Sequence, residues 1–204
     1  MRAVGLIVAI IVLVPSLVSG EETLFPKEFT SGYFGGLELG VTEIGDEVGL
    51  VGGVRGGWII NHRAALGANV QMLINDIDFD TTVPDSTSPV DTTLSVMTIY
   101  GGAEFTYIHN PKRLFHYTAS LLVGAGAISY KDYECSLCGE ESDLDQDIFF
   151  VLEPELTVVV NISSMVRAAL GFRYRYVYDV ELRGVNNSDL TGASGALTIK
   201  IGRF

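Results

Sequence analysis

The chain has 204 residues, of which 48% are hydrophobic and 19% are charged, a composition typical of one folded domain and not of a disordered chain. Acidic residues outnumber basic ones by 25 to 13, and the net charge of −12 excludes the basic surface that nucleic-acid binding requires. The 2 cysteines are too few for a disulfide-dense scaffold or a four-cysteine zinc site.

The first segment of the chain has the pattern of an export signal. A positive start at Met1-Arg2 precedes an apolar run over residues 3–14, and small residues end the segment at Gly20. This pattern predicts a signal peptide over residues 1–20, because the apolar run is too short to cross about 30 Å of hydrocarbon. Residues 21–30 are then expected to form a short N-terminal segment. No later stretch is apolar enough for a membrane helix, so a membrane-embedded chain would have to form a closed β-barrel.

Beyond this point, apolar and polar residues alternate with a period of two, which is typical of half-buried strands. The alternating segments are 33–44, 48–60, 64–75, 95–107, 114–130, 148–160, 165–179 and 193–204. In residues 165–179 one face is apolar and aromatic, and the other carries Arg167, Arg173 and Arg175. The pattern predicts an all-β fold over residues 31–204, an eight-stranded antiparallel up-and-down transmembrane β-barrel.

The connections differ between the two rims of this barrel. Those at one rim are short, at 61–63, 109–113 and 161–164. Those at the other rim are mostly long, at 76–93, 131–147 and 179–192, with a short connection at 45–47. Outer-membrane barrels have long loops outside the cell and short turns in the periplasm, so the long connections are expected to face outward.

A period of two does not say which face of each strand lies inside. A soluble, lipocalin-like periplasmic carrier of an apolar ligand would have the opposite orientation, with a cavity lined by Phe172 and Leu170. Two features favour the membrane barrel: aromatic residues gather near strand ends on the apolar face, and the polar face balances acids against bases. A narrow lumen requires such balance, because an unpaired buried charge costs several kcal/mol.

The polar faces therefore predict a network of ion pairs inside the barrel. Its expected members are Glu38, Arg55, Glu104, Glu153, Glu155, Arg167, Arg173, Arg175 and Lys200. Eight strands enclose a space that side chains just fill, so we expect a plugged lumen and no open diffusion pore.

The negative charge of the chain is concentrated at the long-loop rim, which carries 18 of the 25 acidic residues. Asp143, Asp145 and Asp147 would share one side of an extended segment and could form a weak site for a divalent cation. The alternative is a solvated acidic surface. Cys135 and Cys138 are expected to form a local disulfide in an oxidising compartment, while metal or redox chemistry is the less favoured alternative.

Catalytic groups are sparse in this sequence. The 3 histidines, His62, His109 and His116, fall near the short turns, so none could act as a base at the long-loop rim. We expect no enzymatic activity. The alternative is a surface enzyme of the outer membrane that uses rim carboxylates with shared, perturbed pKa values.

Three stretches of the sequence carry a resemblance to a known class of proteins. The first stretch is 52–62. The second runs from Glu153-Pro154-Glu155 to Arg173-Tyr174-Arg175-Tyr176, and the third consists of 187–192 and 197–204. In these residues the chain resembles the small eight-stranded outer-membrane β-barrel proteins of Gram-negative bacteria, and more narrowly an uncharacterised group of them. The resemblance implies fold and location, and it carries no activity.

Phe204 is similar to the terminal aromatic assembly signal of those proteins. Because it is out of phase with Ile199 and Ile201, a bulge is expected near Gly202. A second bulge is expected at Pro154, which cannot donate to the ladder.

Together these features predict a structural or ligand-binding, adhesion-type surface protein that displays acidic loops. It is expected to be a monomer without a cofactor and to bind no nucleic acid. Its expected partners are outer-membrane lipid, with divalent cations and lipopolysaccharide at the acidic rim.

Overall fold

The computed structural model describes residues 30–45, 47–83, 90–130, 146–182 and 184–204. The expected signal peptide and nearly all of the segment 21–30 lie outside the described residues, as do Cys135, Cys138, Asp143 and Asp145.

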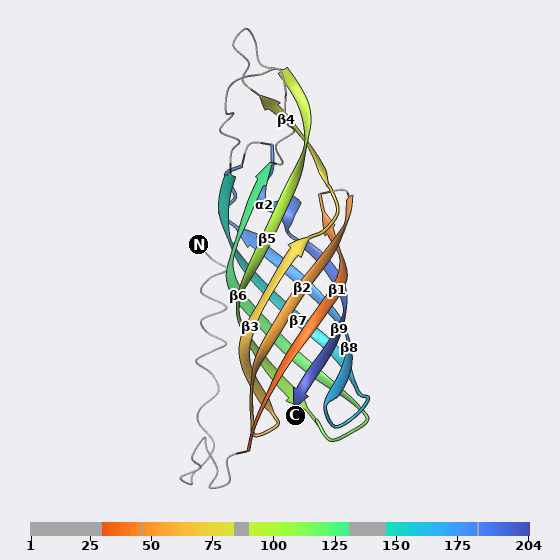
Figure 1. Ribbon diagram of the computed structural model, residues 1–204. Coiled ribbons are helices and arrows are strands. Elements are labelled where there is room, and N and C mark those ends of the chain that lie inside the picture. Colours follow the sequence, from red (N-terminus) through yellow and green to blue (C-terminus); the bar gives the residue numbers. More distant parts are fainter. Residues whose placement is uncertain (1–29, 46, 84–89, 131–145, 183) are drawn as a thin grey trace, which may run out of the picture.

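The described residues form nine strands and one short helix (Figure 1). They are β1 (Ser31–Ile44), β2 (Glu47–Ile60), β3 (Ala64–Leu73), β4 (Asp78–Val83), β5 (Val90–His109), β6 (Phe115–Tyr130), β7 (Gln146–Asn161), β8 (Val166–Tyr178), α2 (Asn187–Leu190) and β9 (Gly192–Arg203). The strands pair antiparallel in the order β3-β2-β1-β9-β8-β7-β6-β5, and β3 pairs with β5 to close the ring. The described strands other than β4 thus form a closed eight-stranded up-and-down barrel, as predicted.

The alternation in sequence sets the orientation of the side chains. Phe172 and Leu156 are 60% and 68% exposed on the outer surface, whereas Arg173 is 1% exposed in the interior. This arrangement excludes the soluble carrier, because that fold needed Phe172 and Leu170 around an internal cavity. The outer surface is apolar, as expected for a barrel that meets lipid. Among the described residues, no helix is long and apolar enough to cross a membrane.

The region expected to be a long loop over residues 76–93 is partly sheet. β4 pairs with the first part of β5, from Val83↔Val90 to Asp78↔Ser95, and this hairpin projects beyond the barrel at the long-loop end (Figure 1). The strand predicted over 95–107 therefore begins earlier, at Val90, because the segment before it contains threonine and valine, which favour extended backbone. The loop 179–192 likewise contains the short helix α2.

Neither expected bulge is present. The pairing of β1 with β9 continues in register through Phe34↔Gly202, so Phe204 stays in phase with the inward positions. At Pro154 the β7–β8 ladder lacks two pairs, but Leu152↔Tyr176 and Glu155↔Arg173 keep the same register on either side. The missing N–H of proline interrupts hydrogen bonding without inserting a residue.

The barrel interior is layered along its axis. An apolar cluster fills the long-loop end, where Phe149, Val96 and Ile128 meet Leu182 and Leu190 from the connection 179–191. A smaller cluster of Ile59, Ala65 and Ile108, with Phe34 and Phe204 against it, fills the short-turn end. The predicted charged residues lie largely between these two clusters.

Candidate functional site

The centre of the barrel holds a group of ion-paired side chains that we call the ionic layer. Its members are Glu38 of β1, Arg55 of β2, Glu104 of β5, Glu153 and Glu155 of β7, and Arg173 of β8. All are inward positions of their strands and are 7% exposed or less. Because alternate residues of a strand face opposite sides, these side chains point toward one another from five strands.

Arg55 makes contacts across the full width of the lumen. Its Nη2 lies 2.5 Å from Glu38 Oε2, and its Nη1 donates a 2.9 Å hydrogen bond to Glu155 Oε2. Glu104 Oε1 lies 3.6 Å from the same Nη1. One guanidinium therefore neutralises carboxylates from β1, β5 and β7, which ties together strands that are not neighbours in the sheet.

Arg173 completes the layer from the opposite wall. Its Nη2 donates to Glu38 Oε1, and its Nη1 donates a 3.3 Å hydrogen bond to Glu153 Oε1. Glu38 is thus shared between two arginines, one at each of its oxygens. Buried charges that are paired and hydrogen-bonded in this way resist displacement, because losing one partner leaves another without compensation.

Neutral side chains that the sequence analysis left out of the network extend it. The Tyr100 hydroxyl lies 2.9 Å from both Gln71 Oε1 and Glu153 Oε2, and Gln71 Nε2 donates to Glu153 Oε1 at 3.1 Å. Asn69 Nδ2 donates to Glu104 Oε2 at 3.0 Å, and Thr198 Oγ1 donates to Glu38 Oε2 at 3.2 Å. The sequence could have indicated these four residues as members of the network, because each is at an inward position of its strand.

Three expected members make no ion pair with the described residues. Arg175 Nε instead donates a 2.6 Å hydrogen bond to the carbonyl of Leu190, and its Nη2 donates to the carbonyl of Glu43 at 3.3 Å. Arg167 lies over the Phe204 ring at 3.8 Å, and Lys200 lies 5.3 Å from the centre of the Phe34 ring. Arg175 therefore braces the long-loop end, while Arg167 and Lys200 lie against the aromatic residues of the short-turn end.

The short-turn end contains a small chamber of about 20 Å³, which is large enough for a single water molecule. Phe34, Phe204, His116, Arg167 and Lys200 contribute to its wall. This chamber and the apolar cluster of the long-loop end thus lie toward opposite ends of the barrel.

The long-loop rim is described only in part. Glu47, Asp76, Asp179 and Glu181 are exposed to solvent. Asp147 accepts backbone hydrogen bonds from Ile148 at 2.8 Å and from Glu181 at 2.5 Å, so both of its oxygens serve the local backbone. Within the part of the chain that the structure describes, no group of three or more His, Cys, Asp or Glu side chains could hold a metal ion.

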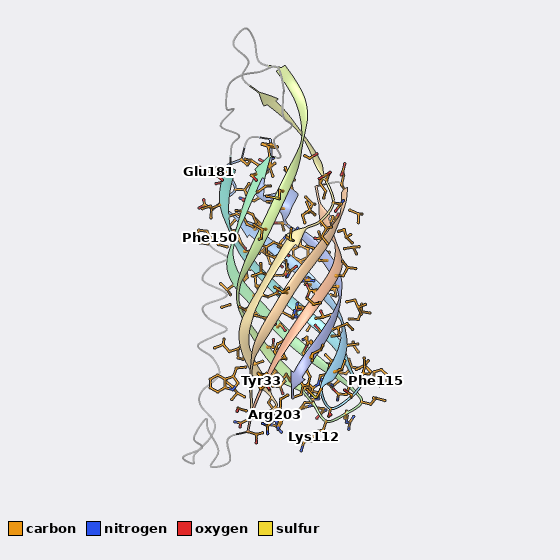
Figure 2. The ribbon with its side chains drawn as sticks, in the orientation of Figure 1. Tyr33, Lys112, Phe115, Phe150, Glu181 and Arg203 are labelled. Atoms are coloured by element: carbon orange, nitrogen blue, oxygen red, sulfur yellow. The ribbon has the colours of Figure 1, made fainter. Side chains whose placement is uncertain are left out.

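The outer surface carries aromatic side chains near both ends of the barrel. Trp58, Phe105, Tyr107, Phe115 and Tyr117 are exposed near the short turns, and Tyr174, Tyr176 and Tyr178 are exposed near the long loops. In Figure 2, Tyr33 and Phe115 lie near the short-turn end, and Phe150 lies toward the other end. Two aromatic belts on an otherwise apolar wall are the mark of a barrel that crosses a membrane.

Comparison with solved structures agrees with this geometry. The crystal structure of neisserial surface protein A matches with a TM-score of 0.55 at 13% identity, over 87% of this chain and 99% of that chain. The fold is that of the small eight-stranded outer-membrane β-barrels.

Two further structures were matched with lower scores. Ail of Yersinia pestis matches with a TM-score of 0.47 at 10% identity, over 84% of this chain and 97% of that chain. The N-terminal barrel of Pseudomonas aeruginosa OprF matches with a TM-score of 0.46 at 7% identity, over 83% of this chain and 96% of that chain. No protein-family model matches the sequence, and neither does any curated protein.

Proposed function

We propose that this chain is an outer-membrane protein whose plugged, ion-paired barrel anchors and displays its long acidic loops, in a structural or ligand-binding, adhesion-type role. The observation that carries this proposal is the ionic layer closed between two apolar clusters. A barrel filled in this way offers no passage to solutes, so its function belongs to the surfaces it presents. The aromatic belts and apolar wall support the membrane location.

The arrangement of charges in the lumen favours a structural role over transport. Glu38 and Arg55 each bind more than one partner, and their side chains are 2% and 1% exposed. Moving a solute past them would require breaking several buried pairs together, each of which is costly to separate. We therefore assign the ionic layer to holding the strands in register.

The loop end is the surface on which we expect partners. Its excess of carboxylates favours divalent cations, and such cations could bridge it to the phosphate groups of lipopolysaccharide. We propose that the barrel acts there as a monomer. The alternative of a surface enzyme has less support, because no pair of rim carboxylates among the described residues is buried together.

Solute flux through reconstituted vesicles tests the proposal. Purified barrel in liposomes is expected to admit no more arabinose than empty liposomes, whereas a general porin at equal protein density gives rapid swelling. Flux comparable to that of the porin would refute the closed lumen.

Location and loop display need a second experiment. In the outer-membrane fraction the folded barrel is expected to migrate differently on gels before and after boiling. Protease added to intact cells is expected to cut within the long connections and to spare the short turns. Recovery in the soluble periplasm would refute the membrane location.

A further inference from the structure

A cleft of about 390 Å³ lies between two turns at the short-turn end. The function proposed above concerns the opposite end of the barrel and gives this cleft no role. Residues 61–63, between β2 and β3, form one side, and residues 110–113, between β5 and β6, form the other. We call this feature the turn cleft. Its volume is in the range of sites that hold small ligands.

The barrel architecture fixes the two sides of the turn cleft against each other. Because β3 pairs with β5, the turns are neighbours, and the backbone N–H of Ile108 donates to the carbonyl of Arg63 at 2.7 Å. Asn161 braces the second turn by donating from Nδ2 to the carbonyls of Pro111 at 3.0 Å and Arg113 at 2.7 Å. The cleft is therefore formed before any ligand arrives.

Left-handed backbone shapes both turns. Asn61 and His62 have φ of 52° and 57°, and Asn110 has φ of 51°. Asparagine is among the few non-glycine residues that adopt this conformation readily, so the sequence is suited to these tight turns.

The charge of the turn cleft has one sign. Arg63, Lys112 and Arg113 line it, and all three side chains are exposed. The described residues of the short-turn end expose no side-chain carboxylate, since the acids of the neighbouring strands, such as Glu104, point into the lumen. Three cations held together without an acid repel one another, and an anion between them relieves that repulsion.

The position of the turn cleft relative to the membrane indicates which anion it binds. Trp58 lies three residues before Asn61 on the outer wall, and Tyr107 and Phe115 flank the second turn. Aromatic side chains of this kind lie at the level of lipid headgroups. The adjoining cations are therefore at the level of the phosphate groups in the leaflet that the short turns face.

We propose that the turn cleft binds the phosphate of an anionic glycerophospholipid headgroup in the periplasmic leaflet. The three cations receive the phosphate oxygens, and the acyl chains lie along the apolar wall beside Trp58. This inference rests on the proposed membrane location and adds a specific lipid to it. Clusters of basic residues beside a membrane surface recognise anionic lipids in this way.

Trp58 can serve as a fluorescent probe for this site, because it is the only tryptophan of the chain, is exposed, and precedes the cleft residue Asn61 by three positions. The barrel is reconstituted in phosphatidylcholine vesicles that contain a minor fraction of phosphatidylglycerol. Bromine is placed on the acyl chains of one lipid or the other, and quenching of Trp58 then reports which lipid surrounds it. We expect the anionic lipid to be enriched about five-fold at Trp58 over its bulk fraction.

The variant R63Q/K112Q/R113Q removes the cations and is expected to reduce the enrichment to about one-fold, the bulk value. Arg203→Gln is the matched control, because Arg203 is an exposed cation near the same end (Figure 2) but does not line the turn cleft. Should the triple variant fail to fold, Arg63→Gln and Lys112→Gln are measured singly, and each is expected to lose part of the enrichment.

The outcomes separate this inference from the proposed function. Enrichment that is lost in the triple variant and kept in Arg203→Gln supports the site. Equal quenching by both brominated lipids in the unmodified protein, or enrichment that survives the triple change, overturns it. Loss of that enrichment in excess inorganic phosphate at constant ionic strength would also support the site, because the free anion competes with the lipid phosphate for the same three cations. A barrel that does not insert into vesicles refutes the proposed function instead.

Discussion

Glu38 and Arg55 meet inside the barrel from neighbouring strands, with Glu38 Oε2 2.5 Å from Arg55 Nη2. Glu38 is in register with Gly53, so Arg55 lies two residues further along β2 and approaches diagonally. This pair connects the walls of the barrel, because Glu38 also binds Arg173 of β8 and Arg55 also binds Glu155 of β7.

Replacing Glu38 by glutamine is expected to lower the free energy of unfolding by about 3–5 kcal/mol, because it leaves two buried arginines short of a counter-charge. The measurement is urea unfolding in lipid vesicles, followed by Trp58 fluorescence. Glu43→Gln is the matched control, an identical change on the same strand at an exposed position, and it is expected to leave stability unchanged. Equal effects of the two changes would contradict a central role for Glu38.

A second prediction concerns the connection that covers the long-loop end. Leu190 of α2 is 1% exposed, and its carbonyl accepts a hydrogen bond from Arg175. Leu190→Ala is expected to cost about 2–4 kcal/mol, as for other buried leucines, and to expose residues 179–191 to protease. Limited proteolysis of the folded barrel measures this, with the exposed Ser188→Ala as control. A rate of cleavage equal to that of the control would mean that α2 does not hold the connection in place.

Whether a side chain points into or out of the barrel could be predicted from the sequence, because the alternation with a period of two can be read without knowledge of the tertiary structure. Arg173 is inward and Phe172 is outward as the alternation required. The partners could not be predicted in the same way. Arg55 and Glu155 are 100 residues apart and belong to strands that are not neighbours. Which residues meet across the lumen depends on strand tilt and stagger, which alternation does not define.

The burial of three apolar residues, Phe204, Leu182 and Leu190, was also not predicted correctly from the sequence. Phe204 was treated as an outward aromatic that required a bulge, but the unbroken register turns it inward, where its ring lies 6.4 Å from that of Phe34. Leu182 and Leu190 lie in an acidic connection and gave no periodic signal, yet both are buried in the apolar cluster of the long-loop end. Only the closed barrel provides the surface that buries them.

The Tyr100 hydroxyl provides a third prediction, since its neighbours are buried polar atoms. Tyr100→Phe leaves Gln71 Oε1 and Glu153 Oε2 without this partner and is expected to lower the free energy of unfolding by about 1–3 kcal/mol. Tyr107→Phe removes the same hydroxyl from an exposed residue of the same strand and is expected to change little. The two variants are compared by urea unfolding. A smaller effect at Tyr100 than at Tyr107 would argue that the hydroxyl is not part of the network.

Two glycines that look alike in the sequence are predicted to respond in opposite directions to alanine. A Cβ at Gly124 would collide with the carbonyl oxygen of Gly101 on the neighbouring strand, so the β5–β6 pair must shift. We expect Gly124→Ala to lower the free energy of unfolding by about 1–3 kcal/mol, the usual effect of overpacking.

At Gly35 no heavy atom outside its chain neighbours lies within 4 Å of a built Cβ, and the position faces outward. Gly35→Ala is expected to stabilise the barrel by about 0.5–1 kcal/mol, because alanine loses less backbone entropy in a strand. Urea unfolding of the two variants in the same vesicles compares the signs directly. If both changes destabilised the barrel equally, the close approach of the β5 and β6 backbones at Gly124 could not be the cause.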